Sequence, residues 1–184
     1  GVLTCATPAG AGVVLLASTQ TFTGQNTFNN QVTVSSDVVV SGRLASNGNT
    51  FISVYRTGNI ALPADVYRQV PFNTEEFDTQ NEFDTTTSSF TVKRSGVYCF
   101  NATILLTDTT ATTNRLIINI YKNGGNFKAF QQPLNTSVNP SSGVSACIKL
   151  STNDQIAIYA YSTTQAVTIL ADATWTWLTI TQVQ

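Results

Sequence analysis

Residues 72–100 read FNTEEFDTQNEFDTTTSSFTVKRSGVYCF, a stretch in which large aromatic side chains recur at positions expected in strands. They are Phe72, Phe83, Phe90, Tyr98 and Phe100. Each buries about 150–250 Å² when it enters a packed core. Ser95 and Gly96 directly precede the last apolar run, as a tight turn leading into a strand requires. The stretch therefore predicts several strands of one β-sandwich whose core is filled by these aromatics.

The rest of residues 50–184 also has the pattern of short strands, with no helical period. Alternating or continuously apolar runs occupy 90–93, 96–104, 115–121, 155–161, 166–170 and 174–180. Turn-forming sequences separate them at 122–125, 139–143 and 151–154. Many short strands joined in this way predict an all-β sandwich or jelly roll.

The aromatic stretch resembles a family signature. Phe72, Asp78, Phe83, Phe90 and the run Gly96-x-Tyr98-x-Phe100 follow the pattern of the complement C1q globular domain. Further along, 120–124 is similar to that family's strand and turn, and 150–156 is similar to its Leu-x-x-Gly-Asp-x-Val. The resemblance covers about residues 50–184 and implies a ten-stranded C1q/TNF-like jelly-roll sandwich that forms a homotrimer.

The sequence departs from the family pattern at four places. Ala102 stands at the signature's last aromatic, and Asn153 replaces a Gly. Near the end of the chain, Trp175 stands where the family has Phe, and Trp177 replaces the neighbouring Gly.

The resemblance also implies that the last strand lies on the inner sheet, toward the threefold axis. Trp175 and Trp177 are two residues apart, so both are expected on one face of this strand. Together with Tyr159 and Tyr161, from a strand expected beside it, they form the predicted trimer interface of the head. The alternative is that these aromatics belong to the core of a monomer.

Residues 19–48 carry a six-residue repeat that begins at Thr21. The second position of successive repeats is Phe22, Phe28, Val34 and Val40. So few short repeats cannot close a core within one chain, whereas three chains wound together close one around these side chains. We therefore expect a short trimeric β-shaft; an ordinary pair of hairpin strands is the alternative.

The expected organisation thus has three parts. Residues 1–18 are small and apolar, are interrupted by Pro8 and two glycines, and are expected to be an N-terminal docking tail. The shaft follows at 19–48, and the globular head occupies 49–184.

The composition argues against several function classes. Only 10% of the residues are charged, where about 25% is typical, and the net charge is −1. Binding of nucleic acid needs clustered cations, so no nucleic-acid partner is expected. Histidine is absent, which removes the commonest general base, so we expect no enzyme and no catalytic or cofactor-binding residues. The longest apolar run, 11–17, is too short to span a bilayer, so no membrane insertion is expected.

The three cysteines, Cys5, Cys99 and Cys147, are too few for a disulfide framework and show no CxxC spacing. Cys99 and Cys147 lie in apolar runs. We expect them to be buried free thiols that pack as small hydrophobic groups.

Five of the ten acidic residues fall within residues 75–84: Glu75, Glu76, Asp78, Glu82 and Asp84. Calcium takes six to eight oxygen ligands, and some C1q-like relatives bind it near the trimer apex, so a calcium site is one hypothesis. The segment lacks EF-hand spacing, and the alternative is a solvated acidic loop. Asn101 and Asn135 begin N-glycosylation tripeptides, but chance matches are expected in a chain this rich in Asn and Thr.

A tail, a β-shaft and a jelly-roll head in this order resemble the fibre proteins of bacteriophages and adenovirus-like particles. The chain is therefore predicted to be a trimeric fibre or spike on a virion surface, bound to a capsid or tail protein through residues 1–18. Its head would attach to a host-surface glycan or protein receptor, with the neutral polar loops 108–114 and 131–142 as the expected binding surface. The alternative is a secreted C1q-like recognition or adhesion module. Such modules usually carry a collagen stalk, and no Gly-x-y period occurs here.

Overall fold

The computed structural model describes residues 48–107, 113–134 and 138–183, together with the single positions 33, 37 and 39. The chain divides into two compact units, Gly1–Leu44 and Ala45–Gln184, and all strands given below belong to the second. The predicted docking tail and the predicted shaft positions Phe22, Phe28, Val34 and Val40 lie outside the described residues, so the shaft stays a prediction.

Within its described residues, the second unit contains β-strands and no helix. The strands are β1 (Phe51–Tyr55), β2 (Ile60–Leu62), β3 (Arg68–Gln69), β4 (Thr74–Asp78), β5 (Phe83–Asp84), β6 (Ser89–Thr91), β7 (Gly96–Leu106), β8 (Arg115–Lys122), β9 (Gly125–Pro133), β10 (Ser141–Leu150), β11 (Gln155–Ser162), β12 (Val167–Leu170) and β13 (Trp177–Gln182). Four of them, β2, β3, β5 and β6, have only two or three residues, which explains why there are more strands than the ten expected.

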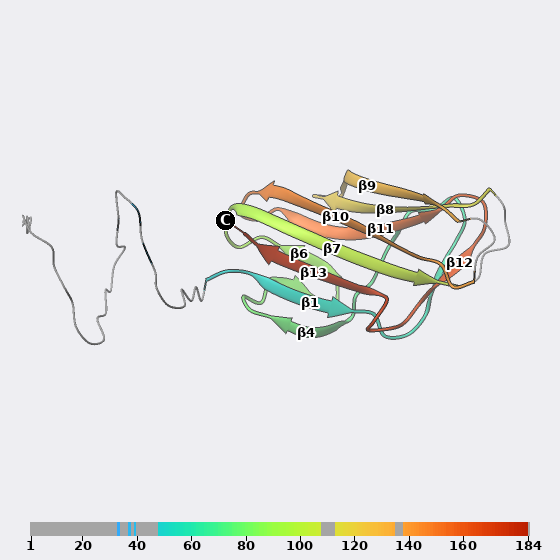
Figure 1. The fold of residues 1–184 in the computed structure, drawn as a ribbon, viewed down its shortest axis with the longest axis horizontal. Coiled ribbons are helices and arrows are strands. Elements are labelled where there is room, and N and C mark those ends of the chain that lie inside the picture. Colours follow the sequence, from blue (N-terminus) through green and yellow to red (C-terminus); the bar gives the residue numbers. More distant parts are fainter. Residues whose placement is uncertain are drawn as a thin grey trace, which may run out of the picture. The chain divides into compact units, whose positions relative to one another are not determined.

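Two antiparallel sheets pack face to face (Figure 1). In sheet A the order is β10-β7-β13-β1-β4, and β12 pairs with the end of β7 that β13 does not reach, with β2 beyond it. In sheet B the order is β5-β6-β11-β8-β9, and β3 pairs with β11. Figure 1 shows sheet A in front, with β8, β9 and β11 of sheet B behind it.

The five aromatic side chains predicted to fill the sandwich lie in the core between the sheets. Phe72, Phe90, Tyr98 and Phe100 are fully buried, and Phe83 is only 7% exposed. The ring centroid of Phe90 lies 5.3 Å from that of Tyr98 and 5.9 Å from that of Phe100. The predicted sandwich core is therefore confirmed.

Two of the predicted turn sequences connect consecutive strands in the structure. Asn123 and Gly124 connect β8 to β9 with φ angles of 51° and 79°, the left-handed conformation that Asn and Gly adopt most readily. Asn153, with φ 71°, connects β10 to β11 in the same way. Its left-handed backbone explains why Asn can stand here in place of the family's Gly.

The last strand begins later than the sequence predicts, at Trp177 rather than residue 174. Asp172 causes the late start, because it forms a turn with the residues that follow it. Its carboxylate accepts a hydrogen bond of 2.6 Å from the backbone N–H of Thr174, and its backbone carbonyl accepts one of 2.8 Å from that of Thr176. Trp175 consequently lies in a turn, 50% exposed. The expectation that both tryptophans project from one strand face is therefore wrong for Trp175.

Candidate functional site

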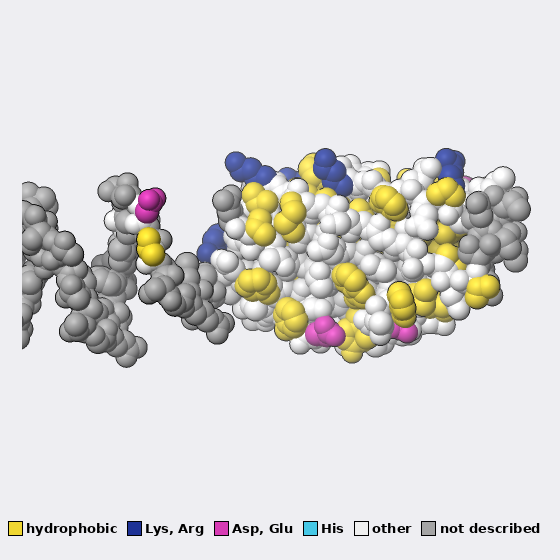
Figure 2. All heavy atoms as spheres, viewed as in Figure 1, with side chains coloured by type: hydrophobic (Ala, Val, Ile, Leu, Met, Phe, Trp, Pro, Cys, Tyr) yellow, Lys and Arg dark blue, Asp and Glu magenta, His cyan; other side chains and the backbone are white. Residues whose placement is uncertain are grey.

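The outer face of sheet A follows from strand alternation. In β7, Tyr98, Phe100 and Ala102 point into the core, so Cys99, Asn101 and Thr103 project outward. Figure 2 shows this face with hydrophobic and uncharged polar side chains over β7, β13 and β1. Basic side chains gather along the edge over β9 and β10, and acidic ones along the opposite edge at β4. The middle of the face therefore carries little charge.

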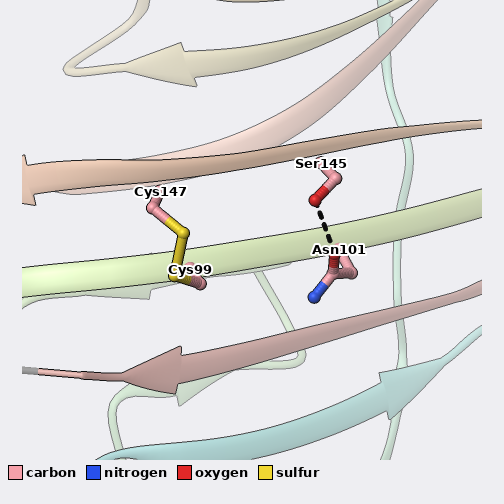
Figure 3. Close-up of a disulfide and its surroundings, with 4 residues drawn as sticks. All are labelled: Cys99, Asn101, Ser145 and Cys147. Atoms are coloured by element: carbon pink, nitrogen blue, oxygen red, sulfur yellow. Dashed lines mark hydrogen bonds between the residues drawn. A yellow bond between two sulfur atoms is a disulfide. The ribbon is translucent and has the colours of Figure 1, made fainter.

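A disulfide joins two strands on this face (Figure 3). Cys99 of β7 and Cys147 of β10 are direct partners in the antiparallel register, and Cys147 is exposed. The expectation of buried free thiols is wrong for both residues, because apolar neighbours in the sequence do not reveal which strand lies alongside. Next along the same strands, Ser145 donates a hydrogen bond of 2.7 Å to the side-chain oxygen of Asn101.

A hollow of about 420 Å³ opens on the same face, lined by Asn101, Thr103, Gly143, Ser145, Trp177 and, from β9, Phe130. The indole N–H of Trp177 donates to the carbonyl of Thr174 at 3.0 Å, which fixes the ring. Only glycine fits at 143, because a Cβ there would lie 2.6 Å from the carbonyl oxygen of Ala102. Trp175 lines a second hollow with Leu105, Asn139 and Ser141, so both indoles open onto the outer face of sheet A.

The two tyrosines assigned with these tryptophans lie elsewhere. Tyr159 and Tyr161 belong to β11, which pairs with β8, β6 and β3 of sheet B and not with β13. The expectation of a neighbouring strand is wrong, because the jelly roll places these strands in different sheets. Both side chains alternate with buried Ile158 and Ala160 and thus lie on the outer face of sheet B.

These two residues form part of a row of aromatic rings, the tyrosine row, made of Tyr161, Tyr67, Tyr121 and Tyr159. Successive ring centroids are 4.5, 6.2 and 4.0 Å apart, and the Tyr121–Tyr159 pair is stacked. Burial, followed by the neighbouring phenols, raises the pKa of Tyr121 above its ordinary value. The pKa of Tyr161 is raised because its hydroxyl donates to the carboxylate of Asp65 at 2.9 Å.

Sequence reasoning missed Tyr67 and Tyr121. A signal existed for Tyr121, since the strands at 115–121 and 155–161 both end in outward-facing tyrosines. Tyr67 lies outside any strand, and only the fold brings it to the row.

A hollow of about 220 Å³ adjoins the tyrosine row. Uncharged side chains line it, among them Gln69, Thr87, Ser89, Gln155, Tyr121 and Tyr159. The side-chain N–H groups of Gln69 donate to the carbonyls of Thr87 and Ser88 at 2.7 and 2.9 Å. This orientation leaves the side-chain oxygen of Gln69 without a donor among the described residues, so it is a fixed acceptor beside the hollow.

A charged network supports the rim of this hollow. Asp154 lies 2.8 Å from Lys122 and accepts hydrogen bonds from the Ser151 N–H at 2.8 Å and the Asn123 side chain at 2.9 Å. These contacts, the bond to Lys122 first, lower the pKa of Asp154 from 3.8 to about 2. The oxygen of the same Asn123 side chain accepts the backbone N–H of Gln155 at 2.8 Å, which joins the network to the hollow.

The five acidic residues do not converge. The carboxylate of Asp78 accepts hydrogen bonds from the backbone N–H groups of Gln80, Glu82 and Phe83. Glu82 is only 5% exposed, and its carboxylate accepts hydrogen bonds from the Thr50 hydroxyl and the Lys93 backbone N–H. Glu76 accepts from Ser53, and Asp84 caps the turn at Thr86. Among the described residues, no three His, Cys, Asp or Glu side chains lie together as metal ligands. The calcium hypothesis therefore stays a prediction that rests on the sequence alone.

The polar loops predicted as the binding surface are only partly described, since 108–112 and 135–137, with the Asn135 tripeptide, lie outside the described residues. Within the described residues, the tyrosine row and its adjoining hollow are the candidate binding surface instead. In the described part of the chain, no helix has the length and apolarity to cross a membrane.

Comparison with known proteins agrees with this fold. The model of the C1q domain family matches residues 50–177. The chain belongs to the C1q domain family. The predicted resemblance and the jelly-roll fold are thereby confirmed, and domains of this family are recognition modules, generally extracellular and trimeric.

Solved structures share the fold at low identity. The globular domain of zebrafish complement 1qA has a TM-score of 0.55 and 18% identity over 73% of this chain and 98% of its own. Murine APRIL at pH 8.5 has a TM-score of 0.55 and 11% identity over 73% of this chain and 99% of its own. Eiger TNF from S. frugiperda has a TM-score of 0.51 and 12% identity over 74% of this chain and 92% of its own. No curated protein matches the sequence of this C1q domain.

We predict that Asp78→Ala lowers the free energy of unfolding by about 1–3 kcal/mol, because three backbone N–H groups lose their acceptor. Urea unfolding of this variant beside Glu75→Ala, whose exposed side chain makes no such bond, measures the difference. Equal stabilities of the two variants would contradict the assignment.

A melting temperature that falls when a chelator is added would support the calcium hypothesis, and an unchanged one would reject a structural ion.

The lowered pKa of Asp154 predicts an acid-dependent stability. A carboxyl group whose pKa is lower in the folded state stabilises the fold above its unfolded-state pKa, and this contribution is lost as pH falls through the folded-state value. The free energy of unfolding should therefore decrease between about pH 5 and about pH 2, and Asp154→Asn should flatten this decrease. Urea unfolding across this pH range measures both slopes; parallel curves would refute the role of Asp154.

Proposed function

We propose that the chain is a trimeric fibre or spike protein of a virion, most simply a bacteriophage, whose C1q-type head attaches the particle to a host-surface receptor. The observation that carries this proposal is the order of the parts. A C1q domain at 50–177 follows six-residue repeats in 19–48, where a collagen stalk would show Gly at every third position. A short shaft that ends in a trimeric recognition domain suits a particle that must hold its binding head away from its surface.

The distribution of side chains on the head supports a trimer. The outer face of sheet A carries Trp177 and little charge, whereas Phe127 and Phe130, 44% and 48% exposed, belong to the edge strand β9. When the edge of one copy packs against the sheet A face of the next, three such contacts close a ring. The basic edge at β9 and β10 and the acidic edge at β4 favour this head-to-tail order (Figure 2).

Threefold symmetry also suits the function. Three receptor sites on one head, and several heads on one particle, convert weak single contacts into firm attachment. In this proposal residues 1–18 bind a capsid or tail protein, and the receptor is a glycan or a protein on the host surface.

A secreted C1q-like recognition module without a virion is the second candidate, and the match to the C1q domain family favours it, because proteins with this domain are generally extracellular. The disulfide between Cys99 and Cys147 fits both candidates, since structural disulfides persist in secreted proteins and on virion surfaces alike. Both candidates have the same head and differ in what the N-terminal residues attach to.

Antibodies against the chain separate the two candidates. For the fibre, we expect gold-labelled antibodies to decorate the surface of purified particles in electron micrographs, and purified protein to block adsorption of those particles to host cells. Protein found only in the soluble fraction, with no effect on adsorption, would refute the fibre and support the secreted module.

The trimer interface is tested by the mass of the assembly. We expect Trp177→Ala to convert a trimer into monomers in multi-angle light scattering, because the indole lies in the middle of the sheet A face, which carries little charge there. Tyr161→Ala is the matched aromatic control on the opposite sheet and should keep the trimer mass. A reversed outcome would move the interface to sheet B, where the sequence-based assignment of Tyr159 and Tyr161 would then hold.

A further inference from the structure

A buried amide lies beneath the tyrosine row. Asn119 of β8 is fully buried, and neither its side-chain nitrogen nor its side-chain oxygen has a hydrogen-bond partner among the described residues. Its neighbours Ile118 and Ile120 point into the core, so Asn119 lies on the outer face of sheet B. Tyr159 is its direct partner in the register with β11.

An unpaired buried amide destabilises a fold, whereas an aliphatic side chain of similar size at this position would not. Most buried polar groups in proteins are hydrogen-bonded, so an exception calls for an explanation. Positions where a sequence breaks a local rule are concentrated at functional sites. Asn119 therefore points to a ligand at this face, independently of the hollow itself.

The surroundings define the chemistry of that ligand. Tyr121 and Tyr159 wall the hollow of about 220 Å³, and the register places Asn119 beside both. Gln69 offers its fixed acceptor oxygen, and the exposed side chain of Gln155 has no hydrogen bond to the described protein. Among the described residues, no charged side chain lines the hollow. The site thus combines aromatic rings with neutral groups that donate and accept.

We propose that this hollow and the tyrosine row form a binding site for a neutral saccharide. The apolar C–H face of a sugar ring packs on tyrosine, while each hydroxyl both donates and accepts, as a Gln or Asn side chain requires. Gln69 and Gln155 bind hydroxyls at the rim, and a rotation of Tyr159 lets one further hydroxyl pair with the amide of Asn119. An acidic sugar is disfavoured, because the lining supplies no cation to pair with a carboxylate or sulfate.

The hollow is smaller than the roughly 300–1,000 Å³ of pockets for drug-sized ligands, so one sugar residue enters it and the next extends along the row. This inference rests on the proposed role as a recognition head and names the class of its receptor. It requires the outer face of sheet B to stay accessible in the trimer.

The test uses the full-length chain on an array of neutral and acidic oligosaccharides, followed by calorimetry with the best neutral ligand. We expect binding to neutral glycans, and at least tenfold weaker binding for Tyr159→Ala and Gln155→Ala. Val183→Ala is the control, since Val183 is an exposed apolar residue that does not line the hollow, and the affinity of this variant should be unchanged.

Asn119→Val distinguishes a ligand-binding amide from a merely structural one. We expect this variant to melt at the same or a higher temperature than the wild type, because an unpaired amide is removed, yet to bind the saccharide at least tenfold more weakly. Unchanged affinity in Asn119→Val and Gln155→Ala would overturn the proposal, as would an array on which the wild type binds no neutral glycan.

If purified protein still blocks particle adsorption in that case, the attachment function stands and only the saccharide site fails. If the glycan binds and adsorption is unaffected, the site stands and the fibre role fails.

Discussion

The head depends on the pairing of one long strand. β7 has eleven residues and pairs with β10 along one side and with β13 and β12 along the other, so it connects most of sheet A. Its alternate side chains, Tyr98 and Phe100 among them, fill the core against sheet B. Because strand alternation has a period of two, the same pairing fixes which side chains project outward. A shift of one residue in the register of β7 would expose the aromatic core and bury Asn101.

The two outer faces follow from this constraint, and they differ in chemistry. The face of sheet A has a cross-strand disulfide, the indole of Trp177 and little charge, all of which suit contact with another copy of the chain. The face of sheet B has stacked tyrosines above a buried amide, beside a hollow lined by neutral polar groups. A trimer built through the first face leaves the second free, so assembly and recognition need not compete for one surface.

The turns connect the fold to the second face. Asn123 forms the β8–β9 turn with a left-handed backbone, and its side chain joins Asp154 to Gln155 at the rim of the hollow. The turn that closes the hairpin therefore also positions part of the candidate site. The Lys122–Asp154 ion pair thus acts on the hollow through Asn123 and Gln155, and neither charged side chain belongs to the described lining.

The sequence by itself determined the all-β class, the aromatic core, the turn positions and membership of the C1q family. These features depend on local periodicity, on left-handed turn residues and on aromatic spacing, all of which are read along the chain. Only the tertiary structure decided that Cys99 meets Cys147, that Tyr159 lies on a different sheet from Trp177, and that Tyr67 joins Tyr161. Alternation tells which residues share a face of one strand but not which distant strand lies alongside. That choice is made by long-range pairing, here across 48 residues for the disulfide, and it leaves no mark in the local sequence.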